Sequence, residues 1–130
     1  MTNTETPTDT TELTAVVDAY LASLSETDPD VRAALVAQAY DPAARFVDPL
    51  QDHKGHDALA GIAPAVNELY PGATFRRTSG VDAHHEFARF GWELVNEDGS
   101  LVIDGIDVCS IAPDGRLAGV AGFFGDLPSA

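Results

Sequence analysis

The chain is short of positive charge, cysteine and long apolar runs, and each shortage excludes a class of protein. Its 130 residues hold 7 Lys and Arg against 21 Asp and Glu, a formal net charge of -14. Such a chain repels phosphate backbones and anionic lipid surfaces, so we expect no nucleic-acid or membrane partner. Its single cysteine, Cys109, excludes an intrachain disulfide and any multi-cysteine metal site. No apolar run approaches the roughly 18 residues that span a bilayer, and a cytoplasmic location is the simplest expectation.

The N-terminal residues differ in composition from the rest. Residues 1–11 are rich in threonine and acid and lack the basic and apolar regions of a signal peptide. We expect them to form a disordered tail. Residues 12–127 are predicted to form a single domain, because 45% hydrophobic residues suffice for a packed core.

Apolar spacing predicts that helices come first in this domain. Apolar residues recur with a helical period over about 12–24, 29–40 and 56–70. Pro64 lies inside the third of these segments, where a proline costs a backbone hydrogen bond, so we expect a kink or break there.

Strands are predicted to follow the helices. A short strand is expected at 44–48 and a polar loop at 50–55, and from residue 73 the apolar period becomes two. Short links between strands favour an antiparallel meander, with helices packed on one face of the sheet, which is an α+β fold. The later strands are expected at about 74–81, 84–96, 101–112 and 115–124.

Three polar residues fall on apolar faces of these elements. Tyr20 interrupts the apolar stripe of the first helix, Asp48 shares a face with Phe46, and Asp107 lies on the otherwise apolar face of strand 101–112. A buried ionised carboxylate is costly unless paired, so Asp107 would tend to keep its proton, whereas Asp48 beside a cavity could act as a general base. Plainer interpretations remain open: a core tyrosine, an Asp-Pro turn and a carboxylate that caps a loop.

Four stretches of sequence resemble the SnoaL-like members of the nuclear-transport-factor-2 superfamily and, within it, the ketosteroid isomerases. Residues 14–24 resemble the first helix of these isomerases, with their catalytic tyrosine at Tyr20. Residues 46–49 are similar to the strand with their general base, 105–107 to the strand with their protonated aspartic acid, and 115–125 to their last strand. The resemblance implies a cone-shaped fold in which three N-terminal helices pack on a curved antiparallel sheet.

The same resemblance implies an isomerase or polyketide cyclase that needs no cofactor. Asp48 would remove a proton from the carbon next to a carbonyl, and Tyr20 and neutral Asp107 would donate hydrogen bonds to the enolate oxygen. The substrate would be a small hydrophobic molecule with a carbonyl group. The substrate-binding residues would be Phe46, His84, Glu86, Phe90, Trp92, Ile103 and Phe124. By the strand phase of the resemblance, His84 and Glu86 would point inward together with Phe90 and Trp92.

Two other chemistries are disfavoured by the sequence. His84 and His85 are neighbours on a predicted strand and point to opposite faces, so without a bulge they cannot bind one ion. Histidines 53 and 56 fall in a polar loop, and we expect no metal. Enzymes similar to limonene-epoxide hydrolase carry an aspartate in the last strand, where this chain has Gly122.

Two non-catalytic alternatives remain: a module of the same fold that binds a small ligand, and a dimerisation unit whose pocket is only packed core. The resemblance implies a homodimer that pairs through the outer face of the sheet. On strand 101–112, Val102, Ile106 and Val108 would give that face an apolar surface.

Overall fold

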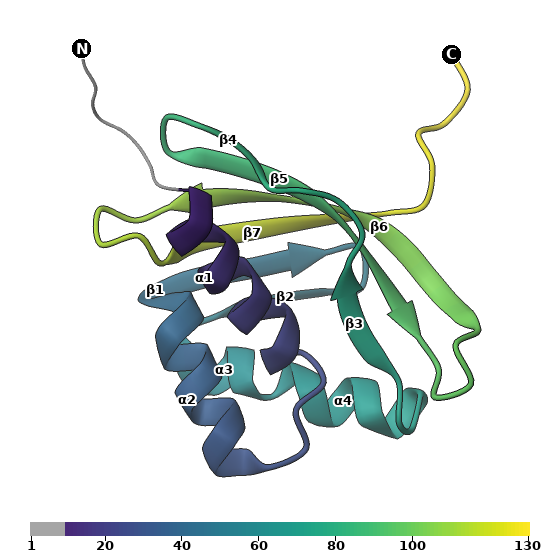
Figure 1. The fold of residues 1–130 in the computed structure, drawn as a ribbon. Helices are drawn as coiled ribbons and strands as arrows, with labels where there is room; N and C mark the ends of the chain where they lie inside the picture. Colours follow the sequence, from purple (N-terminus) through teal and green to yellow (C-terminus); the bar gives the residue numbers. More distant parts are fainter. Residues whose placement is uncertain (1–9) are drawn as a thin grey trace.

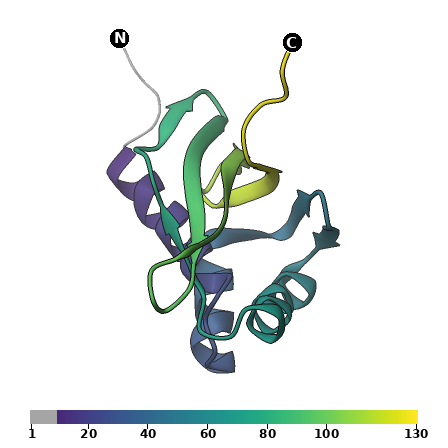
Figure 2. The same ribbon diagram turned by 90° about the vertical axis from the view of Figure 1, so that its right-hand side faces the viewer.

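The computed structural model describes residues 10–130, in which helices cover the inner face of a curved sheet (Figure 1). The view in Figure 2, turned by 90°, shows how strongly the sheet bends around the helices. Of the predicted tail, residues 1–9 lie outside the described part, and Thr10 and Thr11 belong to the first helix.

The first two helices begin and end close to the predicted residues. Helix α1 spans Thr10–Ser23 and helix α2 spans Pro29–Ala39. The Asp28 side chain caps α2 by accepting hydrogen bonds from the backbone N–H groups of residues 30 and 31. Pro29 follows at the first helical position, where its missing N–H leaves no hydrogen bond unmade.

The third predicted helix is divided in two, but not at the expected residue. Helix α3 (His56–Ala60) and helix α4 (Ile62–Leu69) meet at Gly61 rather than at Pro64. Pro64 is the third residue of α4, where the backbone N–H would have no partner within the helix in any case. The proline is therefore accommodated without a kink.

Within residues 10–130, seven strands form one sheet in the order β2-β1-β7-β6-β5-β3, and β4 pairs with β5 outside this path. The neighbouring strands β3, β5, β6 and β7 follow the predicted antiparallel pattern. Strand β1 pairs with β7 in parallel, so the sheet is mixed. The bounds are β1 Tyr40–Asp48, β2 Gln51–Lys54, β3 Thr74–Arg77, β4 Asp82–His84, β5 Phe87–Val95, β6 Leu101–Ile111 and β7 Leu117–Phe124.

Two further differences from the predicted strands affect the site. Most of the expected polar loop 50–55 is strand β2, which forms a tight hairpin with β1 immediately after Asp48. The expected strand 84–96 is interrupted near its start, because His85 has a φ of 51° and turns the chain from β4 into β5.

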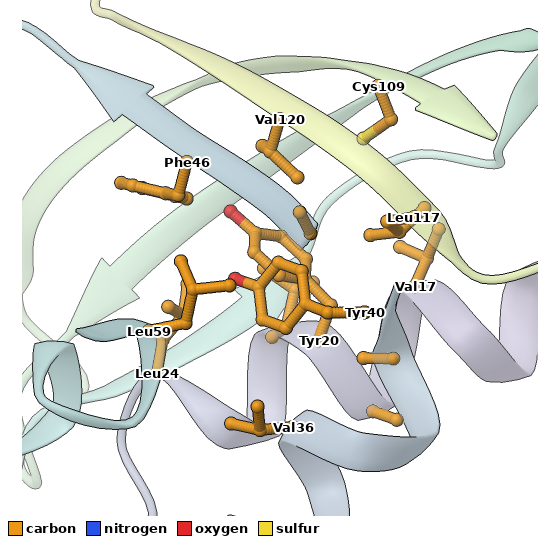
Figure 3. Close-up of a cluster of buried hydrophobic side chains, with 14 of the residues drawn as sticks. Val17, Tyr20, Leu24, Val36, Tyr40, Phe46, Leu59, Cys109, Leu117 and Val120 are labelled. Carbon is orange, nitrogen blue, oxygen red and sulfur yellow. The ribbon is translucent and has the colours of Figure 1, made fainter. Parts of the chain in front are cut away.

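The hydrophobic core fills one end of the concave face. Figure 3 shows Tyr20 and Tyr40 at its centre, with Val17 and Leu117 close by. The rings of Tyr20 and Tyr40 meet edge to face, with centroids 5.7 Å apart. The other end of the concave face is not filled by side chains, and the candidate site lies there.

Candidate active site

A cavity of about 280 Å³ opens between the sheet, the C-terminal part of α1 and helix α4. Its wall is mainly apolar, and no Lys, Arg or His among residues 10–130 lines it. The polar side chains in the wall are Tyr20, Asp48, Gln51, Tyr70, Trp92 and Asp107. Such a wall favours an uncharged, largely apolar ligand with a few oriented polar contacts.

Asp107 is buried where the core meets the cavity. It lies on the inner face of β6, two residues from Cys109 in the core, and is 2% exposed. The Tyr20 hydroxyl donates to Oδ2 at 2.6 Å, and the Trp92 indole N–H donates to Oδ1 at 2.9 Å. The structure therefore brings Tyr20 and Asp107 into direct contact.

Burial changes the acid–base properties of this pair. Desolvation raises the pKa of Asp107 to about 7, although the hydrogen bonds from Tyr20 and Trp92 pull that pKa down. The nearby charge of Asp48 also raises the pKa of Asp107. Burial, and then the charge of Asp107, hold the pKa of the Tyr20 hydroxyl well above its usual value. A raised pKa favours the protonated form of each group, which is the form that can donate a hydrogen bond.

Asp48 lies in different surroundings, at the last position of β1. It is half-buried, lines the cavity and accepts two hydrogen bonds. The backbone N–H of Leu50 donates to Oδ1 at 2.8 Å, and the Gln51 side-chain amide donates to Oδ2 at 3.1 Å. One donor on each oxygen, with solvent within reach, suits an ionised carboxylate that still has free lone pairs.

Gly122 of strand β7 lies between the two carboxyl groups. It pairs with Asp107 across the β6–β7 ladder. A Cβ atom at Gly122 would lie 3.0 Å from Asp107 Oδ1 and 3.4 Å from Asp48 Cβ. Asp48 and Asp107 therefore flank one small space, which the absent side chain leaves open to the cavity.

Most of the predicted substrate-binding residues line this cavity. Phe90 does not line the cavity. It lies in the core and packs edge to face against Tyr20, at a centroid distance of 6.2 Å. Those that line the cavity are Phe46, Trp92, Ile103 and Phe124.

His84 and Glu86 lie elsewhere, which corrects their predicted inward orientation. Both are exposed in or beside the β4–β5 hairpin, and neither lines the cavity. The strand phase that would turn them inward does not apply, because the left-handed residue His85 ends β4.

Sequence reasoning missed the part of the cavity wall that α4 provides. The cavity is lined by Ile62, Val66 and Leu69. Their helical spacing could have indicated a helix whose apolar face covers a cavity. Val102 also lines it, rather than the outer face, because the β5–β6 register shifts at Leu94.

Neither a metal site nor a membrane helix is found in the described part of the chain. No group of three or more His, Cys, Asp or Glu among residues 10–130 could hold a metal ion. No helix in the same range has both the length and the apolar character needed to cross a bilayer.

A solved structure with this fold decides the family. A suggested isomerase of the SnoaL-like family from Agrobacterium tumefaciens matches 89% of this chain and 99% of its own. The two chains are 35% identical, with a TM-score of 0.81. The chain belongs to the SnoaL-like family.

More distant structures share the fold of this SnoaL-like protein. An NTF2-like protein of unknown function from Exiguobacterium sp. is 20% identical, with a TM-score of 0.68 and coverage of 86% of this chain and 99% of its own. A suggested polyketide cyclase from Sinorhizobium meliloti is 19% identical, with a TM-score of 0.65 and coverage of 88% and 99%. No family model and no curated protein matches the sequence.

Proposed function

We propose that this SnoaL-like protein is a cofactor-independent isomerase or cyclase that moves a proton at the carbon next to a carbonyl group. One observation carries the proposal: a half-exposed carboxylate, Asp48, and a buried carboxyl, Asp107, flank one space at the wall of an apolar cavity. Pairs of acids in such unlike surroundings are suited to unlike roles. The suggested isomerase from A. tumefaciens and the suggested cyclase from S. meliloti support both reaction types.

Asp48 is the proposed general base. Its carboxylate takes the proton from the carbon, the C–H electron pair forms the enolate double bond, and the carbonyl π electrons move to oxygen. In an isomerase the proton then returns to another carbon of the conjugated system. In a cyclase the enolate carbon instead attacks a second carbonyl of the same molecule, whose oxygen takes up the proton.

Tyr20 and neutral Asp107 are the proposed donors to the enolate oxygen. Both are held before any substrate arrives, by burial and by their mutual contact of 2.6 Å. Preorganised donors in a site of low dielectric constant stabilise developing charge more than water does, and each commonly contributes roughly 3 kcal/mol.

The cavity narrows the class of substrate. Its volume is about 280 Å³, and its wall offers two acids and no basic side chain among residues 10–130. A carboxylate, phosphate or coenzyme A ester would meet the charge of Asp48 there and no basic side chain of residues 10–130 to pair with. The proposed substrate is an uncharged, apolar molecule with one accessible carbonyl group.

The outer face of the sheet supports a proposed homodimer. Ile106 and Val108 of β6 and Phe123 of β7 are large hydrophobic residues with 50%, 40% and 60% exposure. Ile106 and Phe123 pair directly across the ladder, so they form one apolar patch. Such patches are typical of interfaces. A single species with the mass of the monomer at micromolar concentration, measured by light scattering, would argue against the dimer.

Turnover of a β,γ-unsaturated ketosteroid tests the enzymatic proposal. Formation of the conjugated enone is followed by ultraviolet absorbance in the wild type and in Asp48→Asn. The proposal predicts turnover that Asp48→Asn reduces by several orders of magnitude. A non-catalytic module of the same fold would bind the steroid and convert none of it, and absence of turnover would leave a cyclase acting on another ketone or such a module.

A further inference from the structure

The indole ring of Trp92 is fixed in place against strand β6. Trp92 pairs with Gly105, and a Cβ atom at Gly105 would lie 2.6 Å from Trp92 Cζ2 and would overlap the backbone carbonyl oxygen of Phe123. Only glycine at that position lets the ring lie over the strand. Phe75 and Phe124 meet the indole edge to face, at centroid distances of 5.6 and 5.9 Å. The direction of the indole N–H is therefore set by packing.

That N–H donates to only one of the two oxygens of Asp107. An indole nitrogen can only donate, and Trp92 Nε1 lies 2.9 Å from Oδ1. In a neutral carboxyl group the oxygen without the proton is the better acceptor, so this bond favours a proton on Oδ2. Oδ2 accepts from the Tyr20 hydroxyl at 2.6 Å, but a hydroxyl can rotate and can also accept, so it does not oppose a proton on Oδ2 as a fixed donor would. The protons of Tyr20 and Asp107 then start from neighbouring oxygens and can converge on one ligand oxygen.

The other oxygen lies on the side of Asp48. A Cβ atom at Gly122 would contact both Asp107 Oδ1 and Asp48 Cβ, and the charge of Asp48 acts on Asp107. A proton on Oδ1 would therefore lie on the Asp48 side of Asp107, and two carboxyl groups that interact closely can share one proton. Such sharing would block the base and withdraw the donor from the ligand. The other titratable groups acting on Asp107 or packed near it are Tyr20 on α1, Tyr40 on β1 and Cys109 on β6.

We propose that Trp92 is a positioning residue, which directs the proton of neutral Asp107 onto Oδ2 beside Tyr20 and away from Asp48. The usefulness of this arrangement rests on the proposed function. The position of the proton does not, and it can be tested without a substrate.

Isosteric replacement of the indole N–H tests the proposal. Trp92 is the only tryptophan in the sequence, so biosynthetic incorporation of β-(benzo[b]thiophen-3-yl)alanine, in which sulfur replaces N–H, alters this position alone. The Asp107 and Asp48 carboxyl groups are then titrated by carbon-detected NMR in the wild-type and sulfur-containing proteins. Because the N–H bond holds the pKa of Asp107 down, its loss should move the Asp107 midpoint above the wild-type value of about 7.

A double-variant cycle tests the direction of the proton. Without the N–H the proton can move to Oδ1, so Asp48→Asn should change the Asp107 midpoint more in the sulfur-containing protein than in the wild type. An Asp107 midpoint unchanged by the sulfur replacement would overturn the proposal. Equal effects of Asp48→Asn in the two proteins would overturn it as well.

The single indole N–H resonance gives a second readout in the unmodified protein. It should shift with pH at the Asp107 midpoint in the wild type and stay constant in Asp107→Asn, where the oxygen acceptor remains but the titration is gone. A wild-type indole resonance that does not follow Asp107 would contradict the bond on which the proposal depends. Neither readout uses turnover, so a failure of the proposed function leaves these outcomes interpretable.

Discussion

Asp48 and Asp107 line the same cavity, yet the fold gives the two carboxyl groups opposite surroundings. Asp48 ends strand β1, where the hairpin into β2 leaves the Leu50 N–H free to donate to it. Asp107 lies within β6, between β5 and β7, where backbone N–H groups are used in the ladders and only side chains can donate to it. Two identical side chains therefore lie in different surroundings, because one terminates a strand and the other lies inside a sheet.

The difference shows how a position in a strand sets the surroundings of a carboxyl group. The end of strand β1 leaves Asp48 half-buried, with hydrogen-bond donors from the following hairpin. The inner face of the central strand β6 leaves Asp107 desolvated. Gly122 keeps these two environments adjacent without filling the space between them.

Removing the charge of Asp48 should have the largest effect. Asp48→Asn keeps the shape of the side chain and abolishes the base, so kcat should fall by about 10³-fold or more, with binding of an apolar ligand retained. Asp52→Asn is the matched control, because Asp52 is exposed and paired with Arg45 outside the cavity. A similar loss of kcat in both variants would contradict the proposed role of Asp48 as the base.

Ionising Asp107 should destabilise the protein. Its pKa is about 7 when folded and near 4 when unfolded, so between these pH values only the unfolded chain gives up the proton. Stability should therefore decrease from about pH 4 to pH 7, by up to about 4 kcal/mol, and level off above that. The lowered pKa values of exposed Asp52, Asp98 and Asp114 act in the opposite sense and below this window.

Urea unfolding of the wild type and Asp107→Asn across this range isolates the effect of Asp107. The difference in unfolding free energy between the two proteins should change with pH between 4 and 7. A constant difference would mean that Asp107 is ionised throughout, like an ordinary carboxylate.

Removing the Tyr20 hydroxyl should weaken the donor pair. Tyr20→Phe deletes one proposed oxyanion donor and leaves Asp107 Oδ2 without its partner, so kcat should fall by about 10²-fold. The effect is expected in kcat rather than in KM, because the bond strengthens as charge develops on oxygen. A change confined to KM would indicate that Tyr20 only shapes the cavity.

Adding a methyl group between the two acids should have a smaller effect. Gly122→Ala introduces contacts of 3.0 Å with Asp107 and 3.4 Å with Asp48, and the resulting displacement should lower kcat by about tenfold. Gly119→Ala is the control, since its Cβ atom would meet Ser110 Oγ at the same 3.0 Å on the same strand, outside the cavity. Equal losses would show that strand packing, not the space between the acids, is responsible.

Removing the Tyr40 hydroxyl should have the smallest effect and the opposite sign. Tyr40 is fully buried beside Tyr20, and its hydroxyl has no hydrogen-bond partner among residues 10–130. Tyr40→Phe should therefore raise the unfolding free energy by about 1 kcal/mol and leave turnover within about twofold, measured by denaturant unfolding and kinetics. Destabilisation would show that the hydroxyl has a partner in solution.

The sequence predicts the inner face of β6 from Ile103 onward and the first two helices well, because apolar periodicity reflects burial. Asp107 stands out for the same reason, as the one charged residue on an apolar face. The parallel pairing of β1 with β7 is not predictable in this way, since pairing between strands far apart in the chain leaves no local period.

The inward orientation predicted for His84 and Glu86 fails for a related reason. A single left-handed residue, His85, resets the strand phase, and residues other than glycine adopt that conformation too rarely, even histidine, for the sequence to predict it. The hydrogen bond from Trp92 to Asp107 is not predictable from the sequence either, because it depends on the register between β5 and β6 and on the space over Gly105. Local patterns place residues on faces, but register decides which of them meet.

A carbon-detected NMR titration of the Asp107 carboxyl group in the folded, ligand-free protein tests its proposed role as a donor without any substrate. We expect a midpoint near pH 7, with the protein folded throughout the titration. A midpoint near 4, as for a solvated aspartic acid, would mean that Asp107 is ionised at neutral pH and cannot serve as a hydrogen-bond donor.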